Sequence, residues 1–238
     1  MLDKKTIKDI QSLSVKKYRQ EQRLFVAEGP KIVGELLVLM PQQVLQVYAL
    51  KEWADANLQY EVQVINEDML ARISQQQTPN LVLAVCQQAV HQEPRPVTGW
   101  CLYLDALQDP GNVGTIIRTA DWFGITSVVC SAECADVYNP KVVQATMGSI
   151  ARVAVWFDEA GDWLHRQPLP LFAASLTGSS MFELEQQAGG ILVIGNESKG
   201  IRKDFLAIAQ QLTIPRKGAA ESLNAAVAAG IILAHVTG

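Results

Sequence analysis

The chain has 238 residues, of which 49% are hydrophobic and 18% are charged, a balance typical of a globular protein with one or two domains. No apolar run is long enough to span a membrane, and the N-terminus MLDKKTIKDI lacks the apolar core of a signal peptide, so we expect a cytoplasmic protein. The net charge of −4 argues mildly against nucleic-acid binding by the chain as a whole.

Positive charge is concentrated at the N-terminus. Residues 1–23 carry seven Lys or Arg against three Asp or Glu, a net charge of +4, so the remaining residues together carry −8. A basic segment on an acidic body is suited to contact phosphates, although the same charges also suit the solvated face of an ordinary helix. The sequence leaves both interpretations open.

The first 90 residues alternate between helical and strand patterns. Residues 24–29, LFVAEG, predict a short buried strand or the approach to a helix. Helices are predicted over 6–23, 31–39, 53–58 and 66–74, and Asn66 is the expected N-cap of the last one. Strands are predicted over 44–50, 61–65 and 80–87. Together these elements indicate a small α/β unit.

A linker separates this unit from a larger one, because two prolines and several polar residues in HQEPRPVTG, 91–99, break the pattern. We therefore predict an N-terminal domain 1–92, a linker 93–98 and a C-terminal domain 99–238. The strands expected in the C-terminal domain are 101–105, 127–131, 151–156, 171–176, 190–197 and 212–215. They are continuous apolar runs separated by helices, which predicts a parallel sheet buried on both faces.

Ligands of open parallel sheets bind beyond the carboxyl ends of the strands, and three loops there are unusual. In the first, DPGNVG, Asn112 can cap a helix that ends at Gly124. Arg118 follows on that helix, either as a site residue or as a solvent-facing side chain. The glycines complete neither GxGxxG nor a P-loop, so a nucleotide site has weak support.

The second loop, GNESKG, follows an apolar strand that ends at Ile194. Its two glycines, Gly195 and Gly200, allow the backbone to approach a ligand or to adopt positive φ. A plain strand-to-helix turn needs only one glycine. The second glycine therefore favours a functional role for Asn196 and Glu197, which lie between Gly195 and Gly200.

The third loop, IPRKGAAESLN, precedes an Ala-rich helix. Ser222 is a good N-cap residue and would place Asn224 in the first turn of that helix. Capping accounts for Ser222 but not for Asn224 or Gly218. The small residues of the helix suit close packing, either within the fold or against a second subunit.

The four cysteines do not form a convincing metal site. Cys130 and Cys134 are spaced as CxxxC, but no second Cys or His pair lies near them in the sequence, so we predict no metal. Buried free thiols are the better interpretation.

The three loops taken together resemble the SpoU/TrmH family of the SPOUT superfamily, whose members are RNA ribose 2′-O-methyltransferases. The resemblance covers residues 99–238 and rests on N-x-G-x-x-x-R-x-A from Asn112, G-N-E-x-x-G from Gly195 and I-P-x-x-G-x-x-x-S-L-N from Ile214. No catalytic position departs from the family pattern. The stretch SLSVKKYRQEQRLFVAEGPKIVGELL also resembles, more loosely, the L30e-like substrate-binding domain that precedes many members.

The resemblance implies a parallel sheet whose C-terminal part threads a deep trefoil knot, a homodimer, and S-adenosylmethionine bound in the knot. It implies rRNA or tRNA as the partner, with RNA affinity supplied by Lys16, Lys17, Arg19 and Arg23. The cofactor-binding residues implied are Leu176, Thr177, Gly178, Ile194, Gly195, Asn196, Gly200, Ile214, Pro215, Gly218, Ser222 and Leu223.

By the same resemblance the residues around the reacting hydroxyl are Arg118, Asn112, Glu197, Ser222 and Asn224. Since the methyl donor is intrinsically reactive, catalysis requires mainly alignment and the removal of one proton. Arg118 is either a base in an unusual setting or a phosphate-binding group that lowers the pKa of the hydroxyl, because a guanidinium stays charged in proteins.

Two other functions fit parts of the sequence. A non-catalytic RNA-binding module is disfavoured because all five site residues are intact. A dinucleotide-binding enzyme needs a glycine fingerprint followed by an acidic residue, which DPGNVG does not provide. The two-domain layout favours rRNA over tRNA as the methylated RNA, and the motifs do not encode the target nucleotide.

Overall fold

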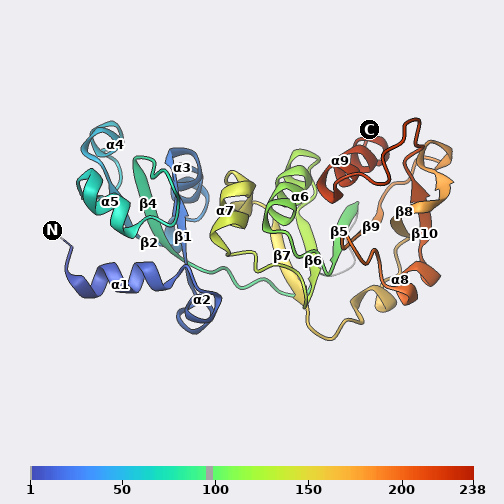
Figure 1. Ribbon diagram of the computed structural model, residues 1–238, viewed down its shortest axis with the longest axis horizontal. Coiled ribbons are helices and arrows are strands. Elements are labelled where there is room, and N and C mark those ends of the chain that lie inside the picture. Colours follow the sequence, from blue (N-terminus) through green and yellow to red (C-terminus); the bar gives the residue numbers. More distant parts are fainter. Residues whose placement is uncertain (1, 95–98) are drawn as a thin grey trace. The chain divides into compact units, whose positions relative to one another are not determined.

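The computed structural model describes residues 2–94 and 99–238 (Figure 1). Its contacts divide the chain into two compact units, Met1–Val90 with Asp136–Ala151 and His91–Ala135 with Arg152–Gly238. The chain therefore passes between the units three times. The domain boundaries inferred from the sequence remain a prediction, and residues 95–98 of the predicted linker 93–98 lie outside the described residues.

The first unit contains a four-stranded sheet flanked by helices. Its elements are α1 Lys4–Ser12, α2 Lys16–Gln22, β1 Leu24–Glu28, α3 Pro30–Leu39, β2 Val44–Ala49, α4 Lys51–Ala56, β3 Gln63–Val64, α5 Glu67–Ile73, β4 Val82–Gln87 and α7 Pro140–Thr146. The strand order is β1-β4-β2-β3, with β4 antiparallel to both of its neighbours and β3 parallel to β2. The α/β unit predicted for this region is confirmed, and Leu24–Glu28 of LFVAEG form a strand that leads directly to α3.

The predicted helix over 6–23 is wrong in one respect, because it is two helices with a break at residues 13–15. The hydroxyls of Ser12 and Ser14 donate to the carbonyls of Asp9 and Gln11, at 2.6 and 2.8 Å, and such side-chain bonds compete with helix continuation. Leu13 is buried at the break. The Asn66 cap is as predicted, with Oδ1 accepting from the Met69 amide at 2.9 Å.

The second unit is built on a six-stranded sheet. Its elements are β5 Trp100–Asp105, α6 Pro110–Trp122, β6 Ser127–Ser131, β7 Ala154–Asp158, β8 Leu171–Ser180, β9 Gly190–Gly195, α8 Lys203–Ile208, β10 Gln210–Thr213 and α9 Ala225–Val236. The strand order is β10-β8-β9-β5-β6-β7, and every neighbouring pair is parallel. The predicted parallel sheet is confirmed, whereas the trefoil knot remains a prediction.

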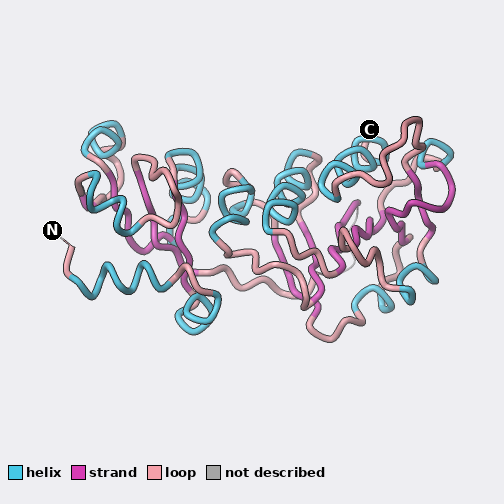
Figure 2. The backbone as a smooth tube through the Cα atoms, viewed as in Figure 1, coloured by secondary structure: helices cyan, strands magenta, loops and turns pink. Residues whose placement is uncertain are grey.

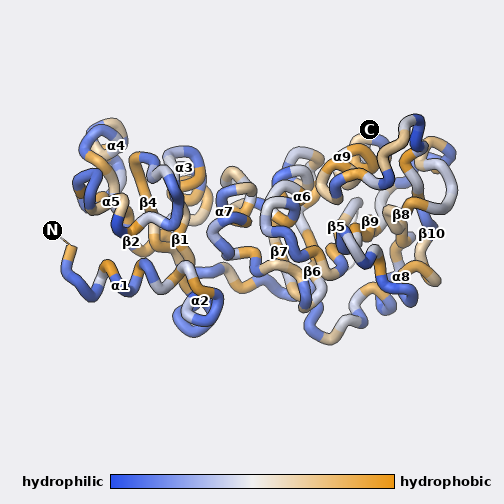
Figure 3. The backbone as a smooth tube through the Cα atoms, viewed as in Figure 1, coloured by the Kyte–Doolittle hydropathy of each residue, from blue (hydrophilic) through white to orange (hydrophobic). Residues whose placement is uncertain are grey.

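Helices cover both faces of this sheet: α6 and α9 lie on one side of the strands and α8 on the other (Figures 1 and 2). On the α8 side, the ring of Tyr103 in β5 meets Phe205 edge-on at 5.3 Å and stacks on Trp163 at 6.2 Å. The apolar stretches of β9 and α9 contrast with the hydrophilic α2 of the first unit (Figure 3). Burial of the strands on both faces explains why they read as continuous apolar runs.

Most strand boundaries differ from the prediction by one to four residues, and two of the differences have a clear local cause. β7 begins at Ala154 rather than at residue 151, because Ser149–Ala151 form a 3-10 helix. β10 ends at Thr213, so Ile214 and Pro215 lie beyond the sheet, where a proline does not remove a ladder hydrogen bond.

All four cysteines are free and buried, as predicted. Within residues 2–94 and 99–238, no helix combines the length and apolar character needed to cross a membrane.

Candidate active site

The first of the three loops leads into α6, which begins at Pro110. Asp109 is the N-cap, with Oδ1 accepting from the backbone N–H of Asn112 at 2.7 Å, and Pro110 follows at the first helical position. The prediction that Asn112 caps this helix is wrong, because an Asp-Pro pair is the stronger start signal. Asn112 instead lies in the first turn, and its side chain is available for other contacts.

The second loop closes on itself after β9. A Cβ atom on Gly195 would lie 2.6 Å from the carbonyl carbon of Gly200, and Gly200 has a φ of +69°. The Gly200 amide donates to the Asn196 carbonyl at 2.9 Å, and Asn196 Oδ1 accepts from the amides of Ser198 and Lys199 at the same distance. Both glycines are thus required by the tight closure, which leaves Glu197 exposed.

The third loop ends at Asn224, which is the true N-cap of α9. Its Oδ1 accepts from the amides of Ala226 and Val227 at 3.0 and 3.3 Å. The prediction that Ser222 starts this helix is therefore wrong by two residues. Because the cap uses only the oxygen of the Asn224 amide, its nitrogen remains free to donate.

The side chains of all three loops meet in one hydrogen-bonded chain. Asn224 Nδ2 donates to Asn112 Oδ1 at 2.8 Å, and Asn112 Nδ2 donates to Glu197 Oε1 at 2.7 Å. Partners separated by 112 and 85 positions in the sequence are thereby joined. Since Asn112 both accepts and donates, the orientation of its amide is fixed, and Glu197 is held at the junction of the three motifs.

Arg118 and Ser222 do not belong to this chain. Both side chains are exposed, and among the described residues neither makes a hydrogen bond or ion pair. Six residues of α-helix turn the direction of the side chain by about 240°, so Arg118 lies on a different face of α6 from Asn112. The structure thus joins three of the five predicted catalytic residues directly.

The predicted cofactor residues Leu176, Thr177 and Gly178 lie in an irregular part of β8. Gln211 of β10 pairs with Ala173, but the next residue, Leu212, pairs with Ser179. Residues 174–178 therefore bulge out of the register, and β8 continues to Ser180, although the strand was predicted to end at residue 176. Gly178 has a φ of +126°, and a Cβ atom there would collide with the carbonyl of Gln211.

The three predicted cofactor segments follow or interrupt strands that are neighbours in the sheet, in the order β10-β8-β9. Ile194 is buried at the end of β9, Ile214 is partly buried after β10, and the other residues predicted in the third loop are exposed: Pro215, Gly218, Ser222 and Leu223. Between 214 and 224 the backbone is irregular. Because parallel strands end at one edge, these segments share an edge of the sheet.

A separate cavity of about 300 Å³ lies at the opposite ends of the strands, lined in part by Gly99, Trp100, Phe123, Gln186 and Val236. Trp100 is the first residue of β5, so this cavity is at the amino edge. It contains none of the predicted site residues.

The predicted RNA-binding residues divide into two groups. Lys16, Lys17 and Arg23 are exposed, whereas Arg19 is only 1% exposed. The Arg19 guanidinium donates to Asp136 through Nε and Nη2, at 3.0 and 2.6 Å, and to the carbonyls of Leu13 and Ser14, both at 2.8 Å. A guanidinium used in this way cannot reach a surface phosphate, so Arg19 does not belong with the other three.

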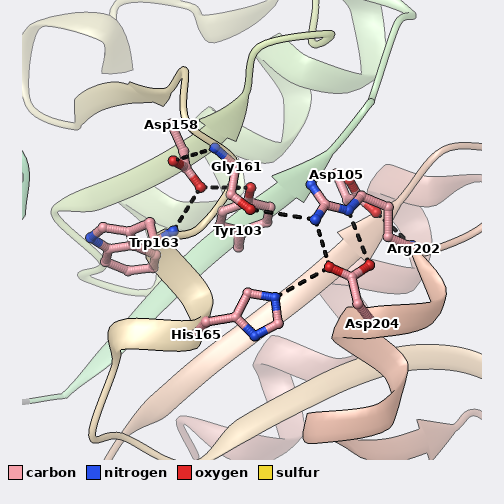
Figure 4. Close-up of polar contacts among 8 residues, drawn as sticks. All are labelled: Tyr103, Asp105, Asp158, Gly161, Trp163, His165, Arg202 and Asp204. Carbon is pink, nitrogen blue, oxygen red and sulfur yellow. Dashed lines mark hydrogen bonds and ion pairs between the residues drawn. The ribbon is translucent and has the colours of Figure 1, made fainter.

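Asp105, the last residue of β5, is buried at the carboxyl edge and belongs to no motif of the sequence. Its Oδ2 accepts from the backbone N–H of Arg202, just beyond the second loop, at 2.7 Å (Figure 4). Burial raises the pKa of Asp105, although the Arg202 amide partly offsets this effect. A carboxylate that ends an apolar strand directly before a loop was the signal that could have identified it.

A parallel sheet with polar loops from three distant segments joined at its carboxyl edge defines an α/β protein with a ligand site at that edge. Comparison with known proteins assigns it further. The chain belongs to the SpoU rRNA Methylase family, which matches residues 99–234, and residues 4–84 match the MRM3-like substrate binding domain. The family predicted from the three motifs is confirmed.

Similar proteins extend over nearly the whole chain. The 23S rRNA (guanosine(2553)-2′-O)-methyltransferase RlmP of Bacillus subtilis (strain 168) is 32% identical over 240 residues, which cover 98% of this chain and 96% of that protein. A structure of a TrmH-family protein from Porphyromonas gingivalis has a TM-score of 0.85 and 40% identity, covering 99% of this chain and 98% of that one. The AdoMet-bound rRNA methyltransferase from Sinorhizobium meliloti has a TM-score of 0.84 and 29% identity, covering 99% and 95%.

Proposed function

We propose that this protein transfers a methyl group from S-adenosylmethionine to a ribose 2′-hydroxyl of ribosomal RNA. The observation that carries the proposal is the hydrogen-bonded chain Asn224–Asn112–Glu197, which unites the three family motifs at one edge of the sheet. Membership of the SpoU rRNA Methylase family and similarity to RlmP, a 23S rRNA methyltransferase, favour rRNA over tRNA. A cytoplasmic location, where bacterial ribosomes are found, is part of the same proposal.

The residues at this edge fit the cofactor. The bulge at residues 174–178, the closed loop at 195–200 and the irregular segment 214–224 offer backbone groups from three neighbouring strands. The exposed side chains of Leu176 and Leu223 add apolar surface beside them. When bound, S-adenosylmethionine supplies an electrophilic methyl group, and these segments would hold and orient it.

The chain's own side chains would align the ribose. Glu197, fixed by Asn112, and Asn224, fixed as the cap of α9, provide polar groups of constant orientation. Arg118 stays charged and has no protein partner among the described residues, so its charge is available for the RNA. We assign it the role of stabilising negative charge as the hydroxyl loses its proton to solvent. The transfer would form the O–CH₃ bond, break the S–CH₃ bond of the donor and leave S-adenosylhomocysteine.

We also propose that the protein is a homodimer. Trp122 on α6 is 84% exposed and Val227 on α9 is 50% exposed, and these two helices pack on each other. Large exposed apolar side chains on two helices that pack together suit an interaction site. Arg118 lies one turn before Trp122 and shares its face of α6, so a second copy bound at Trp122 would lie beside Arg118.

The activity is tested by incubating the purified protein with radiolabelled S-adenosylmethionine and separate pools of rRNA, tRNA and single-stranded DNA. We expect label in rRNA and none in DNA, which has no 2′-hydroxyl. Mapping ribose methylation in rRNA from cells with and without the gene then identifies the nucleotide. Label in tRNA alone would overturn the preference for rRNA, and cofactor binding without transfer to any RNA would indicate a binding module.

The homodimer is tested by sedimentation of the wild type and the Trp122→Glu variant. We expect a dimer for the former and a monomer for the latter, because a carboxylate would be buried without a partner. A monomeric wild type, or a variant that remains dimeric, would contradict this surface.

A further inference from the structure

Two buried carboxylates lie at the carboxyl edge of the six-stranded sheet, Asp105 at the end of β5 and Asp158 at the end of β7 (Figure 4). Each is 1% exposed. A buried carboxylate is costly unless donors surround it, so each is retained for the contacts it makes. The two carboxylates differ in the loop to which each is hydrogen-bonded.

Asp158 holds its own loop. Its Oδ1 accepts from the Gly161 amide at 2.9 Å, and its Oδ2 accepts from the Trp163 amide at 3.0 Å and from the Tyr103 hydroxyl at 3.1 Å. Both oxygens are therefore satisfied, and the loop that they close contains no residue of the three motifs. Asp158 is a structural residue of the sheet edge.

Asp105 holds the second motif loop. Its Oδ2 accepts from the Arg202 amide, two residues after Gly200, and its Oδ1 has no hydrogen-bond partner among the described residues. The loop's other end is tied to the same place, because Asn196 Nδ2 donates to the carbonyl of Ala106 at 2.7 Å. The segment that carries Glu197 is thus fastened at its entry and at its exit to residues 105 and 106.

Ala106 itself is in an unusual conformation, with a φ of +53°, which a residue with a Cβ atom rarely adopts. Its amide donates to the hydroxyl of Ser131 at 2.9 Å, while its carbonyl accepts from Asn196. A strained backbone persists only where its surroundings fix it, and such sites cluster near functional groups. The end of β5 is therefore a rigid anchor and not a passive connection.

The side chain of Arg202 contacts other residues, so only its backbone N–H donates a hydrogen bond to Asp105. The guanidinium contacts Asp204 at 2.5 Å (Figure 4). It also lies over the Phe205 ring at 4.1 Å. It is this pairing with Arg202 that lowers the pKa of Asp204. The backbone contact and the side-chain contacts of Arg202 can therefore be removed separately.

We infer that Asp105 is a positioning residue for methyl transfer: by holding the Arg202 amide, it fixes the loop that presents Glu197 to Asn112. The inference rests on the proposed function, since it names what orients that site. Displacement of a site group by about 1 Å can lower turnover by 10²-fold. Loss of the Asp105 contact therefore impairs turnover more than its effect on stability would suggest.

The test compares Asp105→Ala and Asp105→Asn with the matched control Asp158→Ala, all in the full-length protein. Turnover, KM for RNA, cofactor affinity and melting temperature are measured for each. We expect Asp105→Ala to lower kcat at least tenfold, and Asp105→Asn to recover most of it, because its amide oxygen can still accept from Arg202. Asp158→Ala should lower the melting temperature while the kcat of the folded protein stays within about twofold of the wild type.

A second pair of variants removes the donor and leaves Asp105 in place. Arg202→Ala keeps the backbone N–H, whereas Arg202→Pro removes it at a φ of −52°, which proline tolerates. We expect only the proline variant to reproduce the Asp105→Ala loss. Equal losses in the two Arg202 variants, or parallel falls of kcat and melting temperature in Asp105→Ala and Asp158→Ala, would overturn the inference.

Hydrogen exchange of residues 196–202 separates this inference from the proposed function, because it requires no activity. Exchange in that loop should be faster in Asp105→Ala than in Asp158→Ala. Unchanged exchange in Asp105→Ala would refute the role of Asp105 even in an active enzyme. A wild type that methylates no RNA would refute the function alone.

Discussion

Arg19 in the first unit and Arg118 in the second are both helical arginines that the sequence assigns to RNA chemistry, yet their surroundings are opposite. In the first unit Arg19 is buried, and all of its contacts are internal, to Asp136 and two carbonyls. In the second unit Arg118 is exposed and has no partner among the described residues. Residue type and a basic neighbourhood therefore do not distinguish a structural cation from a functional one, whereas burial and partners do.

The largest expected effect of this contrast is on catalysis. Arg118→Ala should lower methyl transfer by about 10²–10³-fold, the range for a group that stabilises developing negative charge. Its stability should change by no more than about 0.5 kcal/mol, because an exposed side chain without partners contributes little to folding. Transfer assays, cofactor titration and denaturant unfolding are the measurements. Full activity would remove Arg118 from the mechanism, and lost cofactor binding would make its role structural.

The converse is expected for Arg19→Ala. Removal of one partner of a buried ion pair leaves Asp136 uncompensated, which costs about 3–5 kcal/mol of unfolding free energy. Urea unfolding measures the loss, with the exposed Lys17→Ala as the control on the same helix. If Arg19→Ala and Lys17→Ala unfold at the same urea concentration, the two arginines do not differ as the structure indicates.

A moderate effect is expected from the exposed lysines of α2. The Lys16→Ala/Lys17→Ala double variant should bind RNA more weakly and with less salt dependence. Each lost phosphate contact reduces the slope of log K against log salt by about 0.7–0.9, so the pair should reduce it by about 1.4–1.8. Binding isotherms at several salt concentrations decide the matter. An unchanged slope would mean that these lysines are only a solvated helix face.

The smallest effect concerns Glu28, another buried charge of the first unit. Burial raises its pKa above the ordinary 4.5, while Ser74 and Gln75 donate to its oxygens at 2.5 and 2.7 Å and oppose the rise. The folded protein thus holds this proton to higher pH than the unfolded chain, so the stability it contributes is lost as pH rises from 4.5 through the folded pKa.

Glu28→Gln cannot titrate, yet it can still accept from Gln75. The wild type should therefore lose stability relative to this variant as pH rises through that window. Unfolding free energies of both proteins between pH 4 and pH 7 measure the difference. Parallel pH profiles would show that Glu28 ionises equally well in the folded and unfolded states.

Much of the fold could be predicted from the sequence because local patterns determine these elements. Apolar runs predicted the parallel strands of the second unit, and Asn66 was recognised as a cap because its partner lies three residues away. The predicted caps Asn112 and Ser222 were wrong because a neighbouring residue, Asp109 or Asn224, caps the helix instead. Asn224 caps α9 while donating to a residue 112 positions away, a relation that no local pattern contains.

The site was predicted in a similar way. Motif spacing identified the three loops, although it did not show that Asn112 is the central member of their hydrogen-bonded chain. Arg19 was misplaced because its partner, Asp136, is 117 positions away, so its neighbours in the sequence suggest an exposed basic face. Asp105 escaped notice because a single acidic residue at a strand end has no distinguishing spacing.

The segment Asp136–Ala151 belongs to the first unit, although the residues before and after it belong to the second. This excursion limits where the chain can be divided into fragments. Tyr138 packs on Phe25 at 4.7 Å and exchanges hydrogen bonds with the backbone of Ala89, and Asp136 neutralises Arg19. A fragment beginning at residue 99 would carry these groups away from their partners, and a fragment ending at residue 92 would expose the apolar surface they cover. The two halves that the family assignments suggest are therefore not interchangeable modules, because transplanting either one into a related protein would also require its share of this excursion.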